Sequence, residues 1–144
     1  ISPKMMFMGE KDYQQFFLVQ DFMKKKYKTK IYPCRTIRNS KGMALSSRSI
    51  LLSKNDLKIS GLIAKSLFKL KRKIYKKNGL NSIDQKKSME LIQNLKKQLI
   101  NKFNIKIEYL ECRNLINLST NLNNKPFKLF VSYYLNKVRL IDNF

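Results

Sequence analysis

Two short segments of this sequence combine the side chains that phosphate chemistry requires. Residues 9–15 (GEKDYQQ) place a glycine, a lysine and two carboxylates at the expected start of a helix. Further along, residues 42–48 (GMALSSR) set two hydroxyls beside an arginine in a polar stretch. Backbone N–H groups and cations bind the negative charge of a phosphate, and hydroxyls orient it. The two segments therefore indicate a site for a phosphorylated compound.

Each segment also has an ordinary structural explanation. Lys11 and Asp12 could be solvent charges where a helix begins, and Ser46 and Ser47 could belong to a turn. From the residues alone these explanations are favoured. Gln15 is the weakest candidate, because a polar residue early in a helix needs no function.

Composition limits the class of protein. The chain has 144 residues, of which 43% are hydrophobic, so we expect a folded domain with its own core. It has no histidine, which excludes Ser-His and Cys-His nucleophile pairs within this chain. No apolar run reaches the ~20 residues that cross a bilayer, and no signal peptide is visible. Cys34 and Cys112 lack metal-ligand spacing and are interpreted as reduced, small hydrophobic residues of a cytoplasmic protein.

The net charge of +22, from 31 basic and 9 acidic residues, raises the alternative of a basic nucleic-acid-binding module. However, lysine greatly outnumbers arginine and is abundant in every segment together with isoleucine and asparagine. Such uniform enrichment indicates compositional drift and solvated helix faces, as in residues 24–26 and 69–77. Binding that depends steeply on salt would favour the alternative.

Periodicity predicts the elements that must position the two segments. A helix is expected over residues 12–28, capped by Asp12, with an apolar stripe of Phe16, Phe17, Val19, Phe22, Met23 and Tyr27. Residues 30–34 are expected to be extended, and residues 35–48 are expected to form a loop. A second helix follows the Ser53–Asp56 capping pattern and closes at Gly79. Its expected core stripe is Ile59, Ile63, Leu67, Leu70 and Ile74.

The C-terminal part changes from helical to strand periodicity. A third helix is expected after a cap at Ser82, with a buried edge of Met89, Ile92, Leu95, Leu99 and Phe103. After Asn104, inward-facing Ile105, Ile107 and Tyr109 predict a strand. Residues 127–134 and 137–141 predict two more, joined by a turn at Leu135 and Asn136. The expected result is an α+β fold with helices packed on a small three-stranded antiparallel sheet.

Three blocks of this sequence resemble those of a known family. Residues 9–15 resemble the GEKDYQQ block of the pantoate–β-alanine ligases (pantothenate synthetases), and residues 43–48 are similar to their LALSSRN loop. Residues 138–143 (VRLIDN) resemble their C-terminal strand ending, RLIDN. Three blocks in the same order and at compatible spacing span nearly the whole chain.

The resemblance implies a division of the fold. Residues 1–36 would be the last strand–helix of a Rossmann-like nucleotidyltransferase domain that binds ATP. Residues 37–144 would be the complete C-terminal lid domain. A hinge is expected near residues 34–38, because lids of this kind close over their substrates.

It also implies an activity, that of an ATP-dependent, AMP-forming ligase of coenzyme A biosynthesis. ATP adenylates the carboxylate of pantoate with release of pyrophosphate, and the amine of β-alanine then displaces AMP. Mg²⁺ would accompany ATP without identifiable ligands in this chain. The resemblance further implies a cytoplasmic homodimer, and no membrane or nucleic-acid partner is expected.

Site residues follow from the resemblance position by position. Lys11 would face the phosphates, Asp12 the ribose hydroxyls, and Gln15 the pantoate. The nucleotide site would comprise Gly9, Glu10, Lys11, Asp12, Ile37, Leu45, Ser46, Ser47 and Arg48, with Ile37 and Leu45 reading the adenine edge through their backbone. Lys11, Ser46, Ser47 and Arg48 would carry catalysis by stabilising charge as pyrophosphate leaves.

The departures from the family pattern are also informative. The family's N-terminal HxGH signature and its upstream pantoate and β-alanine residues are absent, so we expect a C-terminal half that is inactive without the missing N-terminal half. Arg35, Asn39 and Lys41 replace a proline, a glutamate and an aspartate, and Ser49 replaces an asparagine. A stand-alone regulatory or degenerate paralogue remains a third hypothesis. An HxGH segment directly upstream in the same reading frame would remove it.

Overall fold

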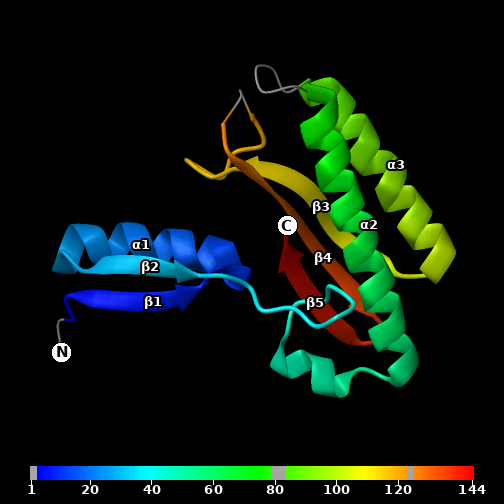
Figure 1. The fold of residues 1–144 in the computed structure, drawn as a ribbon, viewed down its shortest axis with the longest axis horizontal. Helices are drawn as coiled ribbons and strands as arrows, with labels where there is room; N and C mark the ends of the chain where they lie inside the picture. Colours follow the sequence, from blue (N-terminus) through cyan, green and yellow to red (C-terminus); the bar gives the residue numbers. More distant parts are fainter. Residues whose placement is uncertain (1–2, 79–83, 123–124) are drawn as a thin grey trace. The chain divides into compact units, whose positions relative to one another are not determined.

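The chain folds into two compact units in a computed structural model that describes residues 3–78, 84–122 and 125–144 (Figure 1). The first unit is Ile1–Ile37 and the second is Arg38–Phe144. Each unit has its own sheet, so each is described by itself.

The first unit is a parallel strand–helix–strand arrangement. Strand β1 (Met5–Gly9) leads through a 3₁₀ helix, η1 (Glu10–Asp12), into α1 (Tyr13–Tyr27), and β2 (Lys30–Cys34) returns beside β1. The two strands are parallel, with Met5 opposite Lys30 and Gly9 opposite Cys34. Parallel neighbours require such a helical crossover, and Lys28 ends the helix in the left-handed conformation (φ 53°). The Rossmann-like strand–helix expected here is confirmed, and a second parallel strand accompanies it.

The apolar stripe expected on α1 is only partly buried. Phe16 lies in the core of the unit with Ile31 of β2. Phe22 and Tyr27, which the periodicity placed on the buried face, are exposed. A sheet of two strands covers too little of the helix to bury a wide stripe, so this part of the prediction is wrong.

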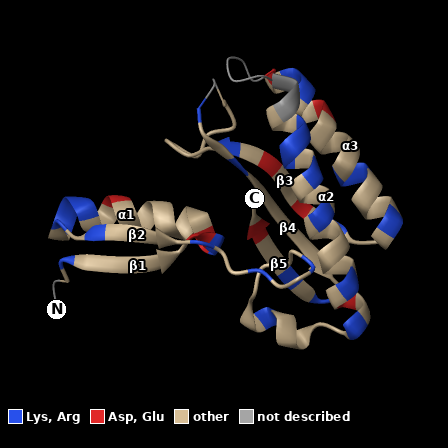
Figure 2. Cartoon of the chain, in the orientation of Figure 1, with Lys and Arg blue, Asp and Glu red and all other residues tan. Residues whose placement is uncertain are grey.

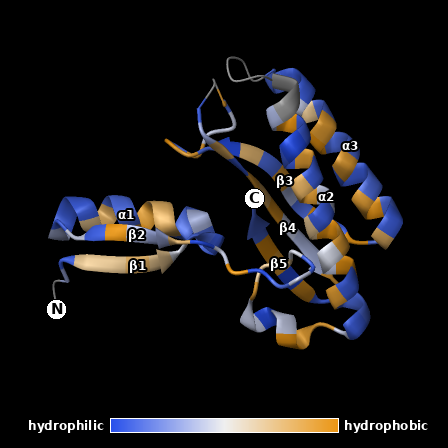
Figure 3. Ribbon diagram, viewed as in Figure 1, coloured by the Kyte–Doolittle hydropathy of each residue, from blue (hydrophilic) through white to orange (hydrophobic). Residues whose placement is uncertain are grey.

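The helices of the second unit are α2 (Lys54–Asn78) and α3 (Gln85–Phe103), in which apolar and polar residues alternate around each helix (Figure 3). The expected stripes are confirmed in the residues that the core buries: Ile63, Leu67, Leu70, Ile74, Ile92 and Leu99. Met89 is 57% exposed, so its assignment to the core was wrong. Asp84 is the N-cap of α3 and accepts a hydrogen bond from the Lys87 N–H. Gly79 and Ser82 lie outside the described residues.

The sheet of the second unit has three antiparallel strands, as expected, and their order is β3-β4-β5. Its strands are β3 (Lys106–Asn114), β4 (Phe127–Leu135) and β5 (Val138–Asn143). The register shifts between Ile107 and Tyr109, which turns Leu110 into the core in place of Tyr109. The expectation that Tyr109 faces inward was therefore wrong, because a bulge cannot be read from alternation alone.

Candidate functional site

The first candidate segment lies where strand β1 ends. Glu10, Lys11 and Asp12 form the 3₁₀ helix η1 directly after the carboxyl end of β1, where open parallel sheets bind ligands. Gly9 is extended, and a Cβ added to it would meet no atom within 4 Å, so the space beside it is open. Asp12 occupies the N-cap position of α1, as expected, but its side chain makes no capping hydrogen bond. Gln15 is exposed on the first turn of α1.

The second candidate segment presents hydrogen-bond donors to solvent. Ser46 is extended, and its Oγ accepts a hydrogen bond from the Arg48 N–H at 3.3 Å. The exposed side chains of Ser47 and Arg48 have no hydrogen-bond or ion-pair partner within the described ranges. The nearby Ser49 hydroxyl is shielded from solvent and has no partner in the same part of the chain. Exposed hydroxyl and guanidinium donors are the groups that bind a phosphate.

The segment that precedes these donors is a loop, as expected, and it contains an ordered turn. Arg38 and Ala44 form a β-bridge, and the N–H of Asn39 donates to the Met43 carbonyl at 3.0 Å. The Asn39 side chain accepts from the N–H groups of Lys41 (3.0 Å) and Met43 (3.1 Å). Gly42 closes the turn with φ +87°, a conformation that favours glycine. We call residues 38–44 the anchor turn.

The anchor turn packs against helix α2. Met43 is buried, and its sulfur accepts a hydrogen bond from the Ser60 hydroxyl. A Cβ at Gly61 would lie 2.9 Å from the Cβ of Lys41, so a glycine at this position of the helix lets the turn approach closely. Ser46, Ser47 and Arg48 therefore follow directly after a turn that is fixed to the core.

The predicted residues are divided between the two units. Gly9, Glu10, Lys11, Asp12, Gln15 and Ile37 belong to the first unit, and Leu45, Ser46, Ser47 and Arg48 to the second. In the second unit the residues form one short segment, and in the first unit Gly9 to Gln15 form another. Ile37 is separate from that segment: it follows β2 and is 72% exposed. That the two groups bind one ligand stays a prediction.

We also searched the described part of the chain for metal sites, reactive cysteines and membrane-spanning helices. No three His, Cys, Asp or Glu side chains there form a group that could hold a metal ion. Neither cysteine is in a disulfide; Cys34 is exposed and Cys112 is buried, and burial raises the pKa of the Cys112 thiol to about 12. Cys112 is therefore no nucleophile near neutral pH. Likewise, no helix found there is long and apolar enough to cross a membrane.

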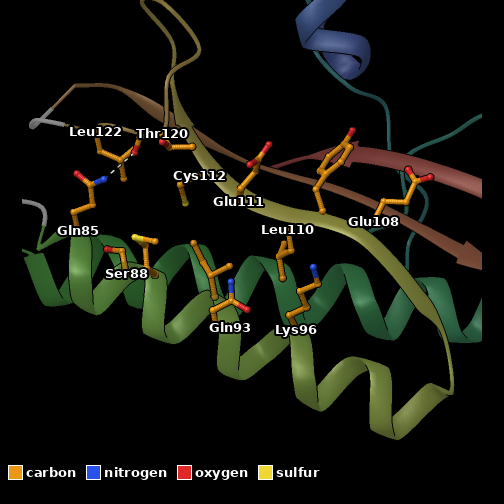
Figure 4. A pocket seen from close by; sticks show the side chains of 13 residues that line it. Gln85, Ser88, Gln93, Lys96, Glu108, Leu110, Glu111, Cys112, Thr120 and Leu122 are labelled. Carbon is orange, nitrogen blue, oxygen red and sulfur yellow. Dashed lines mark hydrogen bonds between the residues drawn. The ribbon is translucent and has the colours of Figure 1, made fainter.

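A cavity of about 380 Å³ lies between α3 and β3 (Figure 4). The Gln85 amide donates to the Thr120 carbonyl at 3.3 Å at one end of it. Its two carboxylates already have partners, since Glu108 pairs with Arg139 and Glu111 with Arg113, each at 2.7 Å. None of the expected site residues lines this cavity.

The sequence prediction missed the residues that hold the second segment. Arg38 binds the carboxylate of Asp142 on β5, and Gly61 admits the anchor turn. One usable signal was present. In a chain where lysine is the common cation, Arg38, Arg113 and Arg139 each pair with a carboxylate, and Arg38 does so through two parallel hydrogen bonds, which lysine cannot make.

Comparison with known proteins identifies the family to which this chain is similar. The model of the family described as pantoate-beta-alanine ligase matches residues 1–144. The chain is 33% identical over 151 residues to a pantothenate synthetase of Azobacteroides pseudotrichonymphae genomovar. CFP2, covering 99% of the chain and 49% of that protein. It is 32% identical to the pantothenate synthetase of Francisella tularensis subsp. novicida (strain U112), covering 99% and 44%. The chain thus spans about half the length of the curated relatives it matches.

Solved structures agree on the fold. A pantothenate synthetase of Thermus thermophilus superposes with a TM-score of 0.77 at 23% identity, over 99% of this chain and 49% of that one. The pantoate-beta-alanine ligase of Francisella tularensis, complexed with beta-gamma ATP and beta-alanine, gives a TM-score of 0.63 at 30% identity, over 99% and 44%.

Proposed function

The chain belongs to the pantoate-beta-alanine ligase family, and from this premise we propose that it is the C-terminal half of an enzyme that condenses pantoate with β-alanine to pantothenate. ATP activates the pantoate carboxylate as pantoyl-adenylate, and β-alanine displaces AMP. The observation that carries the proposal is the segment Ser46–Ser47–Arg48, whose donors follow a turn fixed to the core. The related Francisella tularensis ligase was solved with beta-gamma ATP and beta-alanine bound, which supports the choice of substrates.

The two units have separate roles in this proposal. Residues 1–36 are the end of a Rossmann-like ATP-binding domain, and residues 37–144 are its lid. The parallel pair β1–β2, with Glu10–Asp12 at the carboxyl end of β1, supports the first assignment. A hinge at residues 34–38 would let the lid bring its donors to the nucleotide.

ATP is held from both units. Gly9, Glu10, Lys11 and Asp12 line the nucleotide site, where Lys11 faces the phosphates and Asp12 the ribose. Ile37 and Leu45 read the adenine edge through backbone groups. Ser46, Ser47 and Arg48 hold the triphosphate and stabilise the charge that develops as pyrophosphate departs. Gln15 orients the pantoate.

Mg²⁺ would come with the nucleotide. In this proposal the phosphate oxygens of the nucleotide hold the ion, and this chain supplies no identified ligand to it. When bound, such an ion neutralises phosphate charge.

The N-terminal half of the same enzyme is the required partner. Complete parallel sheets are covered on both faces, yet Met5 and Phe7 of β1 are 58% and 67% exposed. A two-stranded sheet is also marginal by itself. The missing half would supply further strands and the HxGH signature, and the chain alone would be inactive. We place the enzyme in the cytoplasm as a homodimer.

The test uses the full-length enzyme with Lys11→Ala and, separately, Arg48→Ala. Removing a cation that stabilises the departing pyrophosphate should lower the rate of pantoyl-adenylate formation by about 100-fold or more. Pyrophosphate release during a single turnover measures that rate. Lys25→Ala is the matched control, because Lys25 pairs with Asp21 on the exposed surface of α1. Normal adenylate formation by both variants would refute the assignment.

A further inference from the structure

The side chain of Arg38, the first residue of the second unit, donates four hydrogen bonds. Its Nη1 donates to Asp142 Oδ2 at 2.7 Å, and its Nη2 to Asp142 Oδ1 at 2.9 Å. The same two nitrogens donate to the carbonyls of Gly42 (3.0 Å) and Asn143 (2.7 Å). The side chains of Arg38 and Asp142 are only 18% and 10% exposed.

Two aromatic rings complete this environment. The Arg38 guanidinium carbon lies 4.5 Å from the ring centre of Phe144 and 5.2 Å from that of Phe68 on α2. The two rings pack edge to face at 4.8 Å. A guanidinium between aromatic faces gains a cation–π attraction and loses its freedom to rotate. The pair is therefore fixed in one geometry.

The position of the pair suggests what it does. Through Arg38 it joins the end of strand β5 to the anchor turn, which ends at Ala44. The donors Ser46, Ser47 and Arg48 follow within a few residues. A buried ion pair is weak evidence for stability, because desolvation offsets its attraction, but it can specify one arrangement. Here the arrangement that the pair specifies is the course of the backbone from the anchor turn to Ser46, Ser47 and Arg48.

We propose that Arg38 and Asp142 are positioning residues that fix the Ser46–Arg48 segment for the triphosphate, so that the C-terminal strand controls the nucleotide site without touching the ligand. This inference rests on the proposed function. It assigns a purpose to the C-terminal block VRLIDN, whose aspartate is Asp142. A misplacement of catalytic donors by about 1 Å can lower the rate by about 100-fold, even when its cause lies far from the ligand.

The first experiment tests the anchor itself in this chain. We expect Asp142→Asn to speed hydrogen exchange of the amides in residues 39–48 while those of α2 and β4 stay protected. Glu108→Gln is the matched control: Glu108 also accepts a hydrogen bond from an arginine, Arg139 of β5, but its hydrogen-bond partners among the described residues are Arg139, Ser132 and Tyr134, none of which belongs to the anchor turn. Unchanged exchange in residues 39–48 would overturn the proposal.

The second experiment tests positioning in the full-length enzyme. We expect Asp142→Asn and Arg38→Lys to raise the KM for ATP and lower the rate of adenylate formation by about 10-fold to 100-fold. Reaction of β-alanine with preformed pantoyl-adenylate should stay unchanged, because no triphosphate is present. Glu108→Gln should match the wild type in both steps.

The outcomes separate this inference from the proposed function. If Asp142→Asn does not fold, Arg38→Lys, which keeps the charge and loses the paired hydrogen bonds, takes its place. Faster exchange in residues 39–48 with normal ATP kinetics would overturn the positioning role. Normal adenylate formation by Lys11→Ala and Arg48→Ala would overturn the proposed function and, with it, any role of the pair in binding ATP.

Discussion

Glu108 shows how hydrogen bonds to a single carboxylate on an edge strand make the stability of the fold depend on pH. Hydrogen bonds from Ser132 (2.7 Å), Arg139 (2.7 Å) and Tyr134 (2.9 Å) lower its pKa to about 2 from the usual 4.5. Its charged form is therefore favoured by folding. Since the pKa is lower in the folded state, the stabilisation is fully present above about pH 4.5 and is lost as the pH falls towards 2.

This linkage predicts the behaviour of Glu108→Gln. The variant should have a lower free energy of unfolding than the wild type at pH 7, and the difference should shrink below pH 4.5 and disappear near pH 2. Urea denaturation at intervals between pH 2 and pH 7 measures it. Ser132→Ala removes the hydrogen bond that lowers the pKa of Glu108 most, so the free energy of unfolding should change less between pH 2 and pH 7. A difference that is the same at pH 7 and pH 2 would contradict the argument.

At the scale of elements, the first turn of α2 is tied to the β4–β5 hairpin. The Ser53 hydroxyl accepts from the Asp56 N–H at 3.1 Å, and Asp56 accepts from the Ser53 N–H at 3.3 Å. Asn136, in the hairpin turn, donates to both oxygens of Asp56 at 3.1 and 3.0 Å. The capping pattern that the sequence predicted is confirmed, and the buried carboxylate also fixes the turn between two strands.

We predict unequal costs for the two capping residues. Ser53→Ala should lower the free energy of unfolding by about 1 kcal/mol, the usual value of an N-cap. Asp56→Ala should cost about 2–4 kcal/mol, because it also leaves the Asn136 amide without its acceptor. Chemical denaturation gives both values, and Asn55→Ala, exposed in the same turn, is the control. Equal losses for Ser53→Ala and Asp56→Ala would mean that the link to the hairpin contributes nothing.

At the scale of the whole molecule, the charge of +22 is spread over both units. Lysine and arginine residues lie on α1, α2 and α3 and on the sheet of the second unit (Figure 2). Several lysines extend over aromatic rings, such as Lys26 over Phe22 and Tyr27. This distribution is that of solvated faces that keep a protein soluble and repel other cations.

The distribution predicts weak nucleic-acid binding. A titration with duplex DNA at two salt concentrations should show retention that is independent of sequence and disappears at physiological ionic strength. Fluorescence anisotropy with two unrelated duplexes measures both properties. Tight binding to one of them at physiological salt would favour the nucleic-acid alternative over the ligase.

The elements with regular periodicity were predictable because their pattern is local. The stripe of α2, the capping box at Ser53 and the three antiparallel strands all follow from neighbours close in sequence. Strand β1 was not signalled by the residues, since a run of four apolar residues before a glycine has no clear period. Met89 and Tyr109 were misplaced because burial depends on what another element covers, and a bulge changes the face of every later residue.

By itself, the sequence determined the family, the order of the helices and strands after β1, and the two segments that we propose bind phosphate. These depend on residue type and on spacing along the chain. Only the tertiary structure showed that Ser46, Ser47 and Arg48 follow an ordered turn, held by Arg38 against Asp142, more than a hundred positions away (|i−j| = 104). No local pattern encodes such a contact, because it exists only once β5 has paired with β4 and α2 has packed against the sheet.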